Sequence, residues 1–333
     1  RWFSGLGGQT AVRCGRCEMN PAYSVIFFTT ASGLGYGLLA FIGVFVSLGL
    51  LPADRWLGLW GLGVALAAIT FGLLASTFHL GHPERAWRAV TQWRSSWLAR
   101  EGVVALLTYV PAAVLGISWV FFEQISGGIA LAALLVAVTS TITVYCTGMI
   151  YASIKAIPAW HQTAVPVNYV LLAAMTGAVW FLALLHIFDL PTVPVTVIAV
   201  VLLVFGLAAK MNYWRQNDDA PVTSTSGTAT GLSELGDVRL LETPNTSANY
   251  LNKEMGFKVA RKHAVKLRRI AIATGFVVPI IFVILAALAS GISAVFFSLF
   301  AAIIMMIGIV TERWLFFAEA RHVVNLYYGE TTI

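Results

Sequence analysis

The chain has 333 residues, of which 59% are hydrophobic and 11% are charged, and its formal net charge is +6. Soluble domains carry about 25% charged residues, so this composition excludes an ordinary soluble protein. The apolar runs are long enough for helices that cross a bilayer, and they lack the short alternating segments of a membrane β-barrel. The sequence therefore predicts an all-α polytopic membrane protein.

Residues 1–18 are polar and lack the apolar core of a secretory signal. We expect a flexible N-terminal extension here, and Met19 resembles a natural start. Cys14 and Cys17 form a CxxC pair without a second pair, which is too few ligands for a four-ligand zinc or iron–sulfur site within this chain. No metal site is predicted.

Eight apolar runs follow, each long enough to cross a bilayer. The connections after runs one, three, five and seven are short, whereas those after runs two, four and six are long and charged. This rhythm predicts an eight-transmembrane-helix bundle over residues 19–325, both termini on one side, and a C-terminal tail at 326–333. The runs lie at approximately 22–51, 57–79, 102–122, 128–154, 166–188, 190–210, 270–290 and 292–312.

The basic residues are distributed very unevenly between the two sides. All but one of the 21 Lys and Arg residues lie in the termini and the long connections, and the exception is Arg55. Basic residues near helix ends are retained in the cytoplasm. We therefore expect both termini and the long connections to be cytoplasmic.

The third long connection, 211–269, has two parts. Residues 218–228 are rich in Ser, Thr and Gly, a composition that predicts disorder. Residues 254–269 form a basic helix candidate. Attraction to anionic lipid headgroups explains this helix, and a docking surface for a cytoplasmic partner is the alternative.

The interiors of the apolar runs contain no Asp, Glu, Lys or Arg. Because ionisable groups in the bilayer usually mark ion or proton paths, this pattern argues against a pump, an ion-coupled transporter or a voltage sensor. A haem held by two histidines needs them at matching depth on neighbouring helices. Five of the six histidines lie at or beyond the cytoplasmic ends and His186 lies near the opposite end, so we expect no haem.

The first long connection carries the candidate chemistry. His79 closes run two at the membrane boundary, where an imidazole can bond a quinone carbonyl and exchange a proton. Glu101 opens run three and can accept a proton, while Arg85 and Arg88 can reach headgroups or a carboxylate. The alternatives are an interfacial anchor for His79 and stabilisation of the helix start for Glu101.

The second long connection adds Tyr151, which can donate a hydrogen bond, and Trp160, which can stack on a flat ring. At a membrane interface both are more often anchors. Glu312 and Arg313 are expected to form a solvated pair at the end of the last helix. Polar residues of these connections are candidates for partner docking: His82, Arg94, Arg100, Lys155 and His161.

Three motifs together resemble the membrane anchors of the dimethyl sulfoxide (DMSO) reductase type, the DmsC family. The resemblance covers roughly residues 19–325, and the first motif is the most specific. The motifs are His79-Leu80-Gly81-His82-Pro83 with Arg85-Ala86 and Ser95-Ser96 to Glu101; Tyr151-Ala152-Ser153-Ile154 with Pro158-Ala159-Trp160; and Glu312-Arg313 with Phe316-Phe317.

This resemblance implies an anchor in the bacterial inner membrane that exchanges electrons with ubiquinone or menaquinone and carries no haem. It implies two partners, a four-cluster iron–sulfur subunit and a molybdopterin catalytic subunit, besides membrane lipid and no nucleic acid. The important quinol-site histidine and glutamate of the family fall on His79 and Glu101. His82 stands where other members have a different residue, so its role is open.

One feature departs from the DMSO reductase pattern. Those anchors present this loop to the periplasm, whereas the basic residues here predict a cytoplasmic loop. That orientation resembles the SoeC-type anchor of cytoplasm-facing sulfite dehydrogenases, which we prefer. The alternatives are the anchor of a DMSO or polysulfide reductase that oxidises quinol, and a purely structural anchor.

Overall fold

A computed structural model describes residues 23–77, 82–222, 224–242, 258–328 and 330–333. The predicted N-terminal extension, with Cys14 and Cys17, and the candidate residue His79 lie outside the described residues.

Eight helices of the described part are long and apolar enough to cross a membrane, which confirms the predicted all-α class. Their apolar residues lie on all sides, because each faces either lipid or other helices. The helices are α1 (Tyr23–Ser47), α2 (Arg55–Thr77), α3 (Trp97–Phe122), α4 (Gly128–Ala152), α5 (Ala164–Ile187), α6 (Val193–Asp218), the seventh span His263–Leu288, and α11 (Ile292–Ala318).

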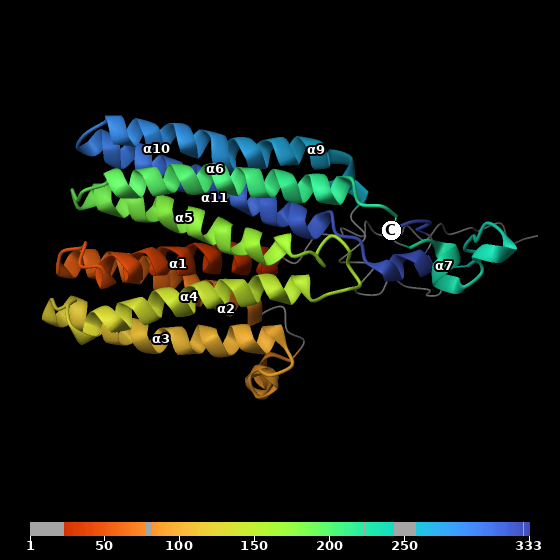
Figure 1. Cartoon of the computed structure of the whole chain (residues 1–333), viewed down its shortest axis with the longest axis horizontal. Coiled ribbons are helices and arrows are strands. Elements are labelled where there is room, and N and C mark those ends of the chain that lie inside the picture. Colours follow the sequence, from red (N-terminus) through yellow and green to blue (C-terminus); the bar gives the residue numbers. More distant parts are fainter. Residues whose placement is uncertain (1–22, 78–81, 223, 243–257, 329) are drawn as a thin grey trace, which may run out of the picture.

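The helices form two packed groups, α1–α4 and α5–α11, that meet along α1 and α5 (Figure 1). These two helices are the most enclosed, with 67% of the apolar window of each buried, against 28–44% for the other six. Helix α1 packs on α2, α4 and α5, and α5 also packs on α6 and α11. The central seam is therefore formed by α1 and α5.

Small residues bring the two central helices into close contact. Gly37 of α1 lies against Ala173 and Gly177 of α5, and a Cβ at Gly37 would collide with the carbonyl oxygen of Ala173. Between membrane helices, close packing takes over the role that the hydrophobic effect has in water. Glycine at this position is therefore required by the seam.

The seventh span is not one regular α-helix. Helix α9 (Lys258–Ile272) passes through a π-helical turn, η3 (Ala273–Val277), into α10 (Val278–Leu288). Pro279 cannot donate the hydrogen bond that would continue the α-helix back to Gly275. The turn brings Gly275 against Gly308 of α11, where a Cβ would meet the backbone.

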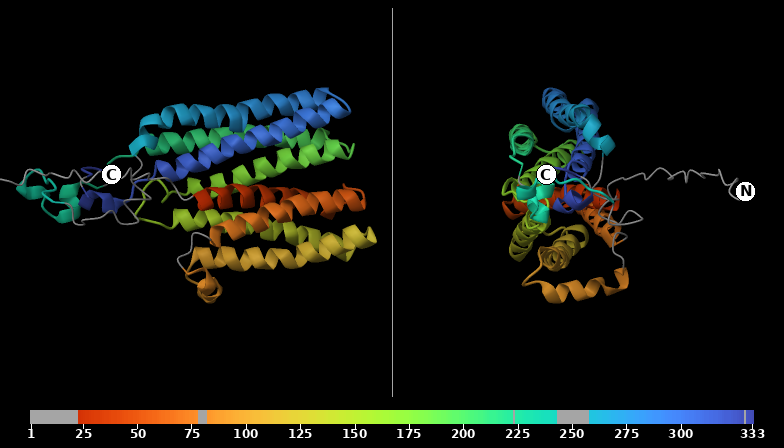
Figure 2. Two further views of the ribbon diagram at one scale, coloured as in Figure 1. Left: turned by 180° about the vertical axis from the view of Figure 1, so that it is seen from behind. Right: turned by 90° about the vertical axis from the view of Figure 1, so that its right-hand side faces the viewer.

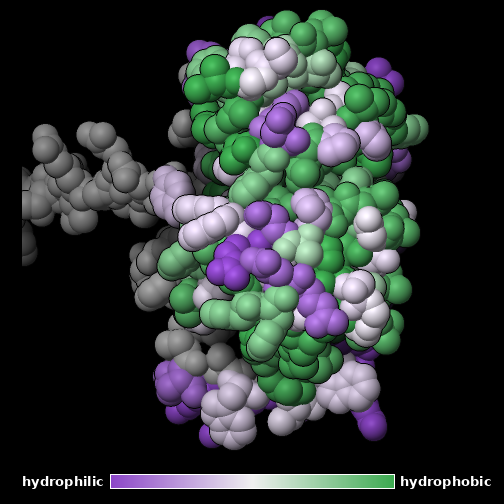
Figure 3. Space-filling view, turned by 90° about the vertical axis from the view of Figure 1, so that its left-hand side faces the viewer, coloured by the Kyte–Doolittle hydropathy of each residue, from purple (hydrophilic) through white to green (hydrophobic). Residues whose placement is uncertain are grey.

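The described parts of the long connections gather at one end of the bundle, which we call the basic end (Figure 1). It comprises the 3-10 helix η1 (Pro83–Gln92), residues 153–163, α7 (Ser226–Thr230), η2 (Ser233–Leu235) and η4 (Val323–Tyr328). The far end has short connections, and its surface is mostly hydrophobic around a compact hydrophilic patch (Figure 3). There Arg55 pairs with Glu123 at 2.7 Å.

Helix η1 runs across the bundle rather than along it, below the start of α3 (Figure 2). Trp87 on this helix and Trp93 directly after it are exposed. The guanidinium of Arg88 is 5.6 Å from the Trp87 ring and that of Arg94 is 5.5 Å from the Trp93 ring. Exposed tryptophans with flanking arginines are typical of a segment that lies at a membrane surface.

The third long connection is more ordered at its start than its composition predicts. Helix α6 continues to Asp218, and α7 begins with a capping box at Thr225. The C-terminal tail pairs with this segment, since Ile333 N–H donates to Ser224 O at 2.9 Å and Ser226 N–H donates to Thr331 O at 3.1 Å. The tail supplies backbone partners that the local composition does not reveal.

The α1–α5 seam gives a direct test of the fold. We expect Gly37→Ala to lower the thermal unfolding midpoint in detergent, because the added methyl group forces the two central helices apart; overpacking typically costs about 1–3 kcal/mol. Gly63→Ala is the matched control, because a Cβ at Gly63 meets nothing within 4 Å. Equal unfolding midpoints for the two variants would contradict the close contact between α1 and α5 at Gly37.

Candidate functional site

Glu101 is buried between α3 and α4 near the basic end, with 4% of its surface exposed. Its carboxylate accepts a hydrogen bond from the hydroxyl of Thr147 on α4, a helix that packs along α3. A buried carboxyl group with a single side-chain hydrogen bond among the described residues is costly in a membrane and points to a functional role.

The structure does not support a role for Glu101 in starting the helix. Helix α3 begins at Trp97, and Ser96 caps it, with its Oγ accepting from Ala99 N–H at 3.4 Å. Glu101 is the fifth residue of the helix, whereas the dipole effect is concentrated in the first turn.

A second group of buried charges joins α6 to α11. Lys210 Nζ forms an ion pair with Glu312, and Arg313 Nε lies 3.6 Å from the second carboxylate oxygen. All three residues are at most 3% exposed. One carboxylate thus lies between two cations in a low-dielectric interior, where such attraction is strong.

These residues correct two expectations from the sequence. Glu312 and Arg313 are not a solvated pair, because α11 continues to Ala318 and buries both. Nor are the membrane helices free of buried charge, since α3 contains Glu101 and α6 contains Lys210. The absence of charges therefore no longer argues against proton movement at this end.

An aromatic cluster surrounds the charges and contains both predicted ring residues. Tyr151 stacks on Tyr169 at 5.6 Å between ring centroids, and Trp160 stacks on Phe316 at 5.5 Å. Trp160 Nε1 donates to Phe316 O at 3.0 Å. Trp160 is only 4% exposed, so it is a core residue of the basic end rather than an interfacial anchor.

Cationic side chains lie against the faces of these rings. The Arg313 guanidinium is 3.7 Å from the centroid of Tyr169, and Lys210 Nζ is 4.1 Å from that of Tyr213. Such contacts stabilise a desolvated cation by about 2 kcal/mol or more. They help to explain how two cations are accommodated beside one carboxylate.

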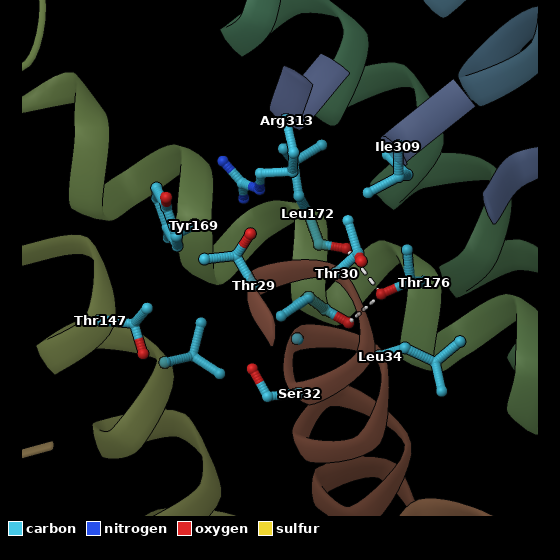
Figure 4. Close-up of a pocket in the computed structure, with 13 residues that line it drawn as sticks. Thr29, Thr30, Ser32, Leu34, Thr147, Tyr169, Leu172, Thr176, Ile309 and Arg313 are labelled. Carbon is cyan, nitrogen blue, oxygen red and sulfur yellow. Dashed lines mark hydrogen bonds between the residues drawn. The ribbon is translucent and has the colours of Figure 1, made fainter. Parts of the chain in front are cut away.

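A small cavity lies between Thr147, the partner of Glu101, and Arg313 (Figure 4). It lies between α1, α4, α5 and α11, and its volume is about 10 Å³, close to that of one water-sized sphere. Hydroxyl groups dominate its polar lining: Thr29, Thr30, Ser32, Thr147, Tyr169 and Thr176. As it stands, the cavity is too small for a quinone ring.

The predicted residues of the first connection lie away from this cavity. Arg85 and Arg88 belong to η1 and are exposed. His82 precedes η1, also exposed, with Nδ1 3.0 Å from Glu84 Oε1. Arg94 is exposed after η1. The structure thus brings Glu101 near Tyr151, which packs against Trp160, but places Arg85 and Arg88 apart from them on the surface helix η1.

Three further docking candidates differ in accessibility. The half-buried Arg100 donates to Trp93 O at 3.0 Å and to Arg94 O at 2.7 Å, so it fastens the connection to α3. Lys155 and His161 are exposed, although Nδ1 of His161 lies 2.7 Å from Ala152 O. Lys155 and His161 are therefore the accessible members of this group.

Sequence reasoning missed Lys210 as a buried partner and Thr147 as the donor to Glu101. The sequence does contain a signal for Glu312 and Arg313, because the apolar stretch Trp314–Ala318 follows them and allows the helix to continue. No local signal identifies Lys210, since its burial depends on where α11 packs against the rest of the bundle.

Comparison with known proteins places these features in a family context. The family described as "DMSO reductase anchor subunit (DmsC)" matches residues 19–329. The chain is also 34% identical to a sulfite dehydrogenase subunit of Allochromatium vinosum over 326 residues, covering 93% of this chain and 99% of that protein. No solved structure matches the chain.

The buried charge cluster predicts unequal effects of removing its members. We expect Glu312→Gln to destabilise the protein by about 3–5 kcal/mol, because it leaves two buried cations without a counter-charge. Lys210→Met should cost less, since Arg313 still neutralises Glu312. Reversible unfolding in mixed micelles measures both.

Glu123→Gln is the control, because it removes the anion of an exposed pair worth about 0–1 kcal/mol. A loss for Glu312→Gln no larger than this control would show that the cluster does not stabilise the fold.

Proposed function

Because the chain belongs to the DMSO reductase anchor (DmsC) family, we propose that this membrane anchor of a molybdoenzyme complex also exchanges electrons with membrane quinone. The proposal rests on one observation above all, the buried carboxyl group of Glu101 with Thr147 as its hydrogen-bond donor. Quinone reduction takes up two protons with two electrons, so a site needs groups that carry protons within the membrane.

The depth of Glu101 suits this chemistry. It lies four residues after the start of α3, about 6 Å along the helix axis at 1.5 Å per residue. A quinone whose headgroup lies in the lipid at the basic end of the bundle would be at about the same depth as Glu101. His79 follows the last described residue of α2 by two positions, and we propose that it and Glu101 exchange protons with the quinone.

The other candidate residues take different roles in the proposal. Tyr151 and Trp160 are packed into the aromatic cluster, so they form the wall of the site. Arg85 and Arg88 are exposed on η1, where they would meet lipid headgroups or a partner. Lys155 and His161, also exposed, would face a docked partner protein.

We propose that the basic end faces the cytoplasm and carries an iron–sulfur subunit and a molybdopterin catalytic subunit. The concentration of Lys and Arg at this end supports the orientation. The name of the Allochromatium relative supports sulfite as the substrate of the complex. Electrons would then pass from sulfite through the iron–sulfur subunit to quinone.

The role of Glu101 can be tested in the assembled complex. We expect Glu101→Gln to lower turnover with decylubiquinone by at least about tenfold, since a positioned proton donor contributes roughly 10²–10⁴-fold. Turnover with ferricyanide, which accepts electrons before the membrane site, should be unchanged. Glu123→Gln, the same change at the far end of α3, is the control.

A purely structural anchor predicts a different result. In that case Glu101→Gln would change the amount of assembled complex but not the ratio of the two activities. This outcome would refute the quinone site while leaving the anchor function in place.

The orientation is tested by labelling single cysteines in a variant without the three native ones. Lys155→Cys lies at the basic end and Ala53→Cys at the far end, and both positions are exposed. In spheroplasts, an impermeant maleimide should label Ala53→Cys at once but Lys155→Cys only after permeabilisation. The reverse pattern would favour a periplasm-facing complex.

A further inference from the structure

We propose that the cavity between α1, α4, α5 and α11 holds water and supplies protons to Glu101. This inference rests on the proposed quinone chemistry and adds a path by which its protons arrive. The path uses two residues that the sequence did not single out for this role, Thr147 and the buried Arg313.

The size and lining of the cavity select water as its occupant. Its volume of about 10 Å³ is at the lower limit for one water molecule, which needs two to four polar partners. Thr29, Thr30 and Thr176 donate their hydroxyl protons to carbonyl oxygens of their own helices. Their oxygens therefore remain available to accept hydrogen bonds from water.

Arg313 provides the independent sign of a missing partner. It is 3% exposed and lines the cavity, and its buried Nε, which lies 3.6 Å from Glu312 Oε2, makes no hydrogen bond among the described residues. Figure 4 shows its side chain beside Tyr169, over whose ring the guanidinium lies. An unsatisfied buried donor is rare and indicates bound water or another acceptor.

The cavity connects to Glu101 through Thr147 and lies near the basic end of α4 and α11. Thr147 lines the cavity and donates to Glu101. Thr147 and Arg313 each lie five residues before the ends of their helices, at Ala152 and Ala318. At 1.5 Å per residue this depth is about 7.5 Å from the helix ends.

The proton balance of the path is simple. Glu101 gives a proton to the reduced quinone, and its carboxylate takes the hydroxyl proton of Thr147. Thr147 takes a proton from the cavity water, and that water takes one from the aqueous phase at the basic end. The fixed charge of Arg313 stabilises the water while it is short of a proton. Two such transfers accompany the two electrons that the iron–sulfur subunit delivers to one quinone.

Gly33 offers a way to fill the cavity. It lines the cavity, and a Cβ there meets nothing within 4 Å. It shares a helix face with Gly37, which packs on α5, so the open space at Gly33 is the cavity rather than lipid. Gly33→Val should displace the water. Gly63→Val is the matched control, since Gly63 is exposed on α2 with open space around it.

The experiment measures turnover of the assembled complex with decylubiquinone in H₂O and D₂O, and binding of the fluorescent quinone analogue 2-heptyl-4-hydroxyquinoline N-oxide. We expect Gly33→Val to lower turnover at least about tenfold, because Glu101 would lose its supply of protons and a positioned proton donor contributes at least this much. The solvent isotope effect on turnover should rise. The dissociation constant of the analogue should stay within about twofold of that of Gly63→Val.

Two results would overturn the proposal. If Gly33→Val weakened analogue binding as much as it lowered turnover, the cavity would be part of the quinone site. If Gly33→Val matched Gly63→Val in every measurement, the cavity would carry no protons. An unchanged activity in Glu101→Gln would instead refute the quinone site itself, so the two failures are distinguishable.

Thr147 gives a second test should Gly33→Val fail to assemble. Thr147→Val keeps the shape but removes the hydroxyl, and we expect the same loss of turnover and larger isotope effect, whereas Thr147→Ser should restore both. Thr141→Val is the control, because Thr141 is exposed on the same helix and bonds to Ala137 O of its own helix. Equal behaviour of Thr147→Val and Thr141→Val would exclude the path.

Discussion

Buried charge in a low-dielectric bundle is the constraint on which the basic end depends. Glu312 lies between Lys210 and Arg313, and an ion without such partners would cost several kcal/mol in this setting. The pairing links α6 to α11, and the rings of Tyr169 and Tyr213 cover the two cations. The aromatic cluster therefore stabilises the buried cations and also forms a packed core.

The central seam allows this arrangement to form. Because Gly37 and Gly177 let α1 and α5 approach closely, Tyr169 near the start of α5 lies within one cavity wall together with Thr29 of α1. Side chains from four helices then line a cavity that is about the size of one water molecule. A larger residue at the seam would move α5 outwards and separate these groups.

Anchoring and quinone chemistry make different demands on this end of the protein. A docking surface needs exposed charge, which η1 and Lys155 provide. Proton transfer needs buried polar groups in fixed positions, which Glu101 and Thr147 provide. The two sets are separated in space: the first lies on the surface and the second one to two turns inside the helices.

The sequence by itself determined the class, the number of membrane helices and the gathering of basic residues at one end, because hydrophobic run length and charge distribution are local properties. It also singled out Glu101, Tyr151 and Trp160 through the motifs that contain them. Only the tertiary structure decided that Glu312 and Arg313 are buried, that Lys210 pairs with them, and that Thr147 donates to Glu101. These contacts join residues 46 to about 100 positions apart, and burial of a charged side chain depends on which helix packs against it, a relation that no single apolar run contains.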